Sequence, residues 1–172
     1  MMSDRQLVPL VVLIDTAAGC WHAATFDASG NPVPLLRSDD GNLDPYLGQP
    51  FDEQVSFLRH RIAGVLQRGC DRLFARQMKA CHFVLIADGD FPEADESVTP
   101  RLAEHFVQWM MNPPVVYLRA PQGFKVQDAG DLEVIAGDFP AEIASIVQAG
   151  LSPLVALQND AECWERIAAP QR

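Results

Sequence analysis

The feature that most constrains the fold is a run of eight apolar residues near the start of the chain, from Leu7 to Ile14, which leads into Asp15. A strand with one face in water alternates apolar and polar residues, whereas a continuous apolar run is typical of a strand buried on both faces. We therefore predict a buried strand over Val11–Asp15. A similar run predicts a second buried strand over His82–Ala87.

The first run has an alternative interpretation. It follows Arg5 and leads into Ala17, Ala18, Gly19 and Cys20, an arrangement that loosely resembles a bacterial lipoprotein signal ending in a lipid-modified cysteine. In that case the first strand would be removed and Asp15 would have no role. The apolar core is short for a signal and Asp15 interrupts it, so a buried strand is favoured.

The remaining elements follow from periodicity and turn chemistry. Strands are predicted over Trp21–Phe26 and Pro32–Leu36, joined by the turn-forming residues 27–31, and the prolines place the second strand at a sheet edge. The apolar spacing then predicts a helix over Asp52–Met78. Further strands are predicted over Val115–Leu118, Leu132–Ala136 and Leu154–Leu157, and further helices over residues 99–110, over Pro140–Ala149 with Gly150 ending it, and from Asn159 onward.

This order predicts one α/β domain over residues 1–172, with an N-terminal antiparallel meander followed by alternating helices and strands in a mixed sheet. The order is similar to RNase H-like and actin-like folds, which open with three antiparallel strands and a helix. The similarity is one of topology and implies no activity. A flavodoxin-like open sheet is the alternative, and it would require the second and third strands to be an insertion or a hairpin.

Charge and cysteine content limit the partners. The chain carries 13 basic and 23 acidic residues, a net charge of −10, which disfavours nucleic acid as a partner. The widely spaced cysteines form no C-x-x-C pair, which argues against a disulfide framework or a structural zinc site and favours a cytoplasmic location. No apolar run approaches the ~20 residues that a membrane-spanning helix needs.

One segment is basic within this acidic chain, since residues 55–82 carry six basic residues and one acidic residue, a local charge of +5. Its cations include Arg61, Arg68, Arg72, Arg76 and Lys79, whose spacing places them within one quadrant of the predicted helix. Such a stripe would contact an acidic protein or a phosphate-bearing partner. Alternatively, it is the solvated flank of an amphipathic helix.

Three carboxylates follow the two buried strands. Asp15 ends the first strand, and Asp88 and Asp90 follow the other. Ligands of open α/β sheets bind at this edge, and clustered carboxylates favour Mg²⁺ or Mn²⁺. Under the RNase H analogy, Asp15 and Asp88 take the first-strand and fourth-strand acid positions and Glu53 adds a helix carboxylate. Asp is also common at strand ends as a cap or turn residue.

The chain has no Walker loop, nucleophile elbow or H-E-x-x-H motif. We therefore expect a binding or regulatory domain that presents its basic helix face to an acidic partner. The alternative is a metal-dependent phosphoryl-transfer or nuclease domain that uses the strand-end carboxylates, with Mg²⁺ or Mn²⁺ as its only implied cofactor.

Overall fold

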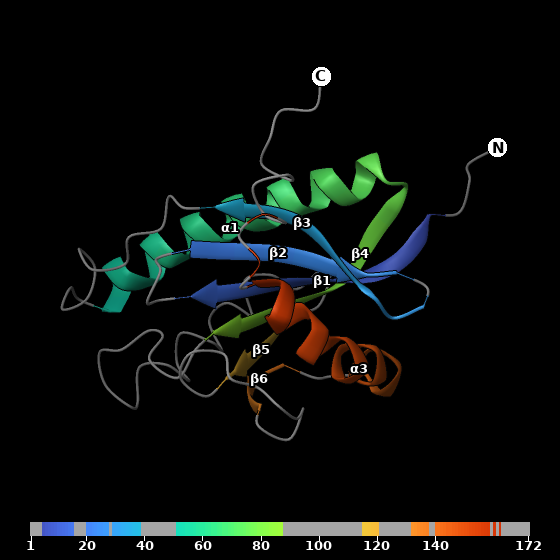
Figure 1. Ribbon diagram of the computed structural model, residues 1–172. Helices are drawn as coiled ribbons and strands as arrows, with labels where there is room; N and C mark the ends of the chain where they lie inside the picture. Colours follow the sequence, from blue (N-terminus) through green and yellow to red (C-terminus); the bar gives the residue numbers. More distant parts are fainter. Residues whose placement is uncertain are drawn as a thin grey trace.

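The computed structural model (Figure 1) describes residues 5–15, 20–27, 29–38, 51–87, 115–120, 132–137, 140–158, 160 and 162. These residues form a six-stranded sheet and two helices. The strands are β1 (Gln6–Asp15), β2 (Cys20–Phe26), β3 (Pro32–Ser38), β4 (Met78–Ala87), β5 (Val115–Arg119) and β6 (Glu133–Ala136), and the helices are α1 (Phe51–Ala75) and α3 (Ala141–Gln158).

The sheet is mixed, as predicted, and its strand order is β3-β2-β1-β4-β5-β6. The strand β2 is antiparallel to both β1 and β3, whereas β4 is parallel to both β1 and β5, and β6 is antiparallel to β5. The predicted meander is therefore one half of a single sheet. The strands β2 and β3 form an antiparallel hairpin that extends the sheet from β1.

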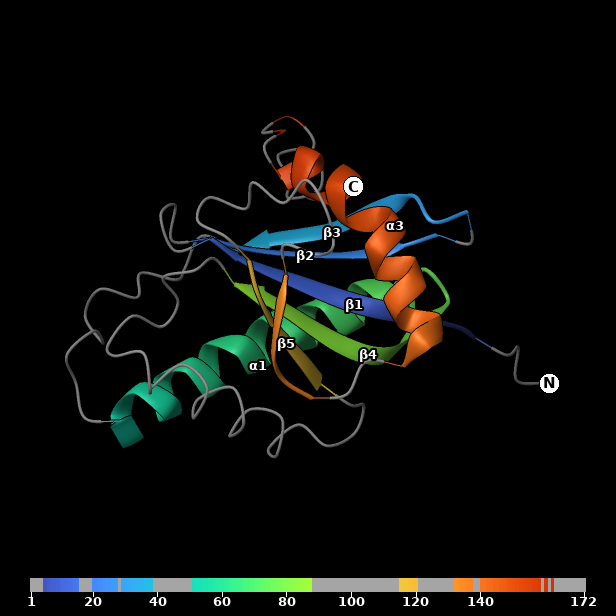
Figure 2. The same ribbon diagram turned by 90° about the horizontal axis from the view of Figure 1, so that it is seen from below.

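The sheet is covered by α1 on one face and by α3 on the other (Figure 2). Side chains of β1 alternate between the two layers: Val8, Leu10, Val12 and Ile14 join the α1 side, and Val11 and Leu13 join the α3 side. This two-sided burial is the reason for the continuous apolar run. Each fully buried Leu, Val or Ile contributes about 1.5–3 kcal/mol relative to an exposed one.

The proline in β1 is accommodated by a local irregularity. Pro9 cannot donate a hydrogen bond to a neighbouring strand, and the β1–β4 register shifts between Val8 and Pro9. The carbonyl of Pro9 accepts a hydrogen bond of 2.7 Å from the buried Thr25 hydroxyl of β2. The register shift therefore accommodates the missing N–H group of Pro9, and the Thr25 hydroxyl satisfies the Pro9 carbonyl.

The turn between β2 and β3 lies where the sequence predicts it. A carboxylate oxygen of Asp27 accepts hydrogen bonds of 2.9 Å from the backbone N–H groups of Ser29 and Asn31. The hydrogen bond from the Asn31 backbone is the largest of the interactions that lower the pKa of Asp27. Gly30 adopts a φ of 82°, a conformation that glycine takes without strain.

The helix α1 ends earlier than predicted. It stops at Ala75, and Gln77 follows with a φ of 59° before β4 begins at Met78. The strand β4 is correspondingly longer than the predicted His82–Ala87 segment. The helix was predicted too long because Met78 is apolar and fits the helical spacing. In the structure Met78 packs against the core as the first residue of β4.

The largest error concerns α3, which continues through the predicted stop at Gly150 and over the predicted strand Leu154–Leu157. A Cβ atom at position 150 would overlap the buried ring of Phe26, so this glycine permits close packing of the helix on the sheet. Pro153 lies within the same helix on its exposed side. Val147, Leu151 and Leu154 are buried at helical spacing, and this packing stabilises the helix across both residues.

The helix predicted over residues 99–110 lies outside the described residues, as does most of the helix predicted from Asn159. Neither described helix is long and apolar enough to cross a membrane.

Candidate functional site

The edge of the sheet at which β1 and β4 end was predicted to carry carboxylates. Asp15 is the last residue of β1 and pairs with Cys20 of β2. Ile14 lies beside Ala87, the last residue of β4, so the two parallel strands end together. Asp88 and Asp90 follow Ala87 in the sequence and lie outside the described residues. The described structure therefore locates the backbone of one of the three predicted carboxylate residues at this edge.

A cation and a thiol meet beside this edge. The Arg37 guanidinium donates a hydrogen bond of 3.1 Å to the Cys20 sulfur, and His22, opposite Arg37 in the β2–β3 register, is 2% exposed. Cys20 is only 2% exposed, which keeps reagents away from its sulfur.

The other cysteines give no support for a metal site. Cys20, Cys70 and Cys81 are not disulfide-bonded, and burial raises the pKa of both Cys70 and Cys81. Within the described ranges, no three His, Cys, Asp or Glu side chains gather closely enough to hold a metal ion.

The five predicted cations do not form one helical stripe. Arg61, Arg68 and Arg72 lie on α1, Arg76 is the first residue after the helix, and Lys79 lies in β4. The prediction of a single stripe was wrong for Arg76 and Lys79, because the helix ends at Ala75 and the chain turns at residues 76–77. Arg61 is partly buried, whereas the other four side chains are exposed.

The last turn of α1 is joined by a cation that sequence analysis missed. The Arg5 guanidinium carbon lies 3.3 Å from the centroid of the Phe74 ring, and the same side chain donates a hydrogen bond of 3.1 Å to the Phe74 carbonyl. Arg5 is 69 residues from Phe74 in the sequence, so no local pattern links them. The ring and the negative end of the helix dipole both attract this cation.

Arg5, Arg72, Arg76 and Lys79 together are named the cationic end. Figure 1 shows that the carboxyl end of α1 and the amino ends of β1 and β4 lie at the same end of the molecule. Asp71 is the only acidic residue in the sequence from 55 to 82, and its carboxylate accepts a hydrogen bond of 3.1 Å from Gln67. Basic residues outnumber acidic residues by six to one within residues 55–82, so the carboxyl end of α1 and the start of β4 are rich in positive charge.

Two large apolar side chains are exposed within this surface. Leu7 and Phe74 are 64% and 63% exposed, more than any other large apolar side chain in the described segments. Leu7 lies beside Lys79 in the β1–β4 register. Their neighbours Val8 and Ala80 pack on the α1 side, so Leu7 and Lys79 project from the opposite face. The surface therefore continues around the end of the sheet.

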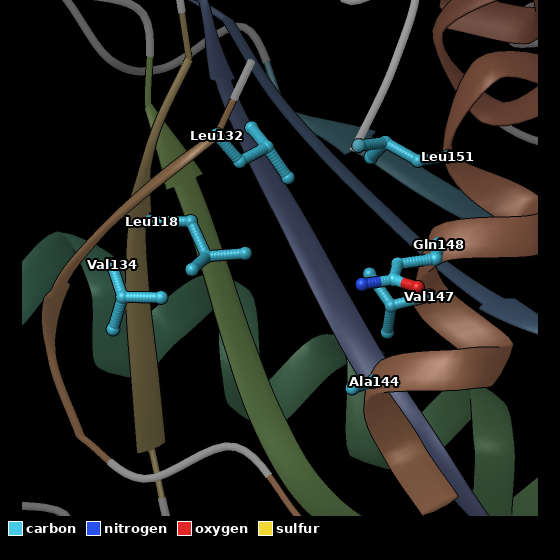
Figure 3. A pocket seen from close by; sticks show the side chains of 7 residues that line it. All are labelled: Leu118, Leu132, Val134, Ala144, Val147, Gln148 and Leu151. Atoms are coloured by element: carbon cyan, nitrogen blue, oxygen red, sulfur yellow. The ribbon is translucent and has the colours of Figure 1, made fainter. Parts of the chain in front are cut away.

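A small apolar pocket lies between α3 and the strands β5 and β6 (Figure 3). Its volume is about 150 Å³, and it is lined by Leu118, Leu132, Val134, Ala144, Val147, Gln148 and Leu151. Leu118, Val147 and Leu151 are buried, whereas Val134 and Gln148 are exposed. Sequence analysis missed this pocket because its walls come from separate elements. A cavity of this size can hold a group such as a benzene ring.

Comparison of the chain with protein-family models, with curated proteins and with solved structures finds no significant match. The chemistry of the described side chains is therefore the basis for assigning a function.

Proposed function

We propose that this protein is a binding domain that holds an acidic partner at the cationic end. The observation that carries this proposal is the contact of Arg5 with Phe74, which brings a fourth cation to Arg72, Arg76 and Lys79. Positive surfaces of this kind attract and orient partners of opposite charge. Cys20, Cys70 and Cys81 are not disulfide-bonded, which suits a reducing compartment, so we place this activity in the cytoplasm.

Each exposed ion pair contributes little by itself, about 0.2–1 kcal/mol, because water and salt screen it. Several cations that act together are therefore needed for measurable affinity, and that affinity should fall as the ionic strength rises. Salt dependence distinguishes this surface from an apolar interface, whose affinity does not fall with salt.

The proposal is tested by titrating the protein into a fluorescein-labelled peptide of glutamate residues and measuring fluorescence anisotropy. We expect binding that weakens with added salt. Each of Arg72→Gln, Arg76→Gln and Lys79→Gln should weaken it about two- to fivefold, as expected for the loss of one exposed ion pair.

Arg61→Gln is the matched control, because it removes the same charge from an earlier turn of α1. Its affinity should stay close to wild type. Equal losses for Arg61→Gln and Arg76→Gln would favour the whole helix as the binding surface. An absence of binding at low salt would remove the proposal.

We further propose that the sheet has RNase H-like or actin-like topology. The strand order β3-β2-β1-β4-β5, with β2 antiparallel to its neighbours, supports this assignment. The strand β6 is then an addition at one edge. Topology alone implies no chemistry.

The parallel pairing of β1 with β4 supports a second candidate function, metal-dependent phosphoryl transfer or nucleic-acid cleavage. Ile14 of β1 lies beside Ala87, the last residue of β4, and Asp15 and Asp88 are the next residues in the sequence. We propose that these two carboxylates hold Mg²⁺ or Mn²⁺. Such an ion polarises a phosphoryl oxygen and activates water.

Asp90 and Glu53 are the further carboxylates that this candidate would use. Glu53 is exposed in the first turn of α1. The binding function ranks first because Arg5 contacts Phe74 at the end of α1 that also carries three exposed cations.

A further inference from the structure

Leu7 and Phe74 are exposed at the cationic end, and these apolar side chains limit which kinds of partner fit this surface. We infer that the partner presents a peptide segment in which a large apolar side chain stands among acidic residues. This inference rests on the proposed function, since it concerns the same surface. It adds that binding requires the apolar side chains of Phe74 and Leu7, which attraction between charges alone would not need.

The first step concerns Phe74. The residue is 63% exposed although Arg5 lies on its ring, so a partner can reach it. An exposed apolar residue is common by itself. Aromatic residues and arginine, however, are among the residue types that contribute most of the binding energy at protein interfaces, and here the two are stacked together.

The second step concerns Leu7 and Lys79, which lie side by side on neighbouring strands. Here too a large exposed apolar side chain adjoins an exposed cation. Arg5 precedes Leu7 by two residues and reaches Phe74, so it connects the two apolar side chains around the end of the sheet. An exposed apolar side chain therefore lies beside a cation at two places on this surface, Phe74 beside Arg5 and Leu7 beside Lys79.

Charge complementarity selects an acidic peptide over an anionic membrane. The whole chain has a net charge of −10, so a broad anionic surface would repel most of the molecule. A short peptide would contact only the positive end, within the screening length of about 10 Å. Its carboxylates would pair with Arg72, Arg76 and Lys79, while its apolar side chain would cover the ring of Phe74.

The test compares two labelled peptides of equal charge by fluorescence anisotropy. One has acidic residues around a central phenylalanine, and the other has serine in its place. Because burying the phenylalanine side chain against Phe74 removes apolar surface from water, we expect the first peptide to bind about tenfold more tightly, which corresponds to about 1.4 kcal/mol. Phe74→Ala should remove most of that preference and leave the affinity for the serine peptide nearly unchanged.

Ile146→Ala is the matched control, because it truncates another exposed apolar side chain, on α3. It should leave both affinities unchanged. Circular dichroism and thermal melting check that each variant folds. We expect Phe74→Ala to fold, because the side chain that it removes is exposed.

The outcomes separate this inference from the proposed function. If neither peptide binds at low salt, the proposed function fails. If both bind equally well, the cationic end binds acids but the apolar requirement is wrong. If vesicles of anionic phospholipid bind the wild type and not Phe74→Ala, or if light scattering shows self-association that Phe74→Ala abolishes, a membrane or a second copy replaces the acidic peptide as the partner.

Discussion

At the residue scale, the space around a glycine decides its role. Gly64 in α1 and Gly150 in α3 both lie within helices, where glycine costs about 0.5–1 kcal/mol relative to alanine. A Cβ atom at Gly64 would meet only the Arg68 side chain, at 3.7 Å. At Gly150 it would overlap the Phe26 ring, which is fully buried and cannot move aside.

We therefore expect opposite effects from the same substitution at these two positions. Gly64→Ala should raise the free energy of unfolding by up to about 1 kcal/mol through helix propensity. Gly150→Ala should lower it by about 1–3 kcal/mol, since an extra methyl group in a packed core displaces its neighbours. Chemical denaturation followed by circular dichroism measures both. A stabilised Gly150→Ala would show that α3 moves away from Phe26 at little cost.

At the scale of elements, α3 shows how tertiary contacts override local signals. Gly150 and Pro153 are both helix breakers by propensity, with proline costing about 3 kcal/mol in a helix interior. The helix nevertheless spans Ala141–Gln158 because Val147, Leu151 and Leu154 bury on the sheet. The same helix leaves the pocket beside β5 and β6 incompletely filled.

Filling this pocket should stabilise the protein. Ala144 lines it from α3, so Ala144→Leu would place apolar atoms in a volume of about 150 Å³. We expect the melting temperature to rise by about 2–4 °C, which corresponds to about 1 kcal/mol for a domain of this size. Ala149→Leu on the exposed side of the same helix is the control and should show no rise. A fall for Ala144→Leu would indicate that the pocket walls leave no room for the larger side chain.

At the scale of the whole molecule, strand order brings distant segments to the same edge. Residues 15 and 88 are separated by a hairpin and the long helix α1, yet the strands that precede them are neighbours in the sheet. The opposite ends of those two strands meet the carboxyl end of α1 (Figure 1). The carboxyl end of β1, where the backbone of Asp15 lies, and the cationic end are therefore at opposite ends of β1.

The carboxylate edge is tested by melting the protein with and without millimolar Mg²⁺ or Mn²⁺. An ion that binds only the folded state must raise the melting temperature, by about 3 °C for each 1 kcal/mol of stabilisation. Asp15→Asn and Asp88→Asn should abolish that rise. Asp27→Asn, in the turn between β2 and β3, is the control and should retain it. If the wild type shows no rise, the metal-dependent candidate loses its support.

The sequence by itself determined the features that arise from local pattern. Continuous apolar runs predicted β1 and β4, the apolar spacing predicted most of α1, and turn residues predicted the hairpin after β2. These predictions succeed because strand burial, helix periodicity and turn chemistry each act over a few neighbouring residues. The mixed character of the sheet followed from the order of the elements.

Only the tertiary structure decided which distant residues meet. It extended α3 through Gly150, placed Lys79 in β4 and not on the predicted helical stripe of cations, and brought Arg5 onto the ring of Phe74. None of these outcomes has a local signal, because each depends on which faces of the sheet the helices bury and on where the chain returns to it. The apolar pocket likewise exists only once α3 packs beside β5 and β6.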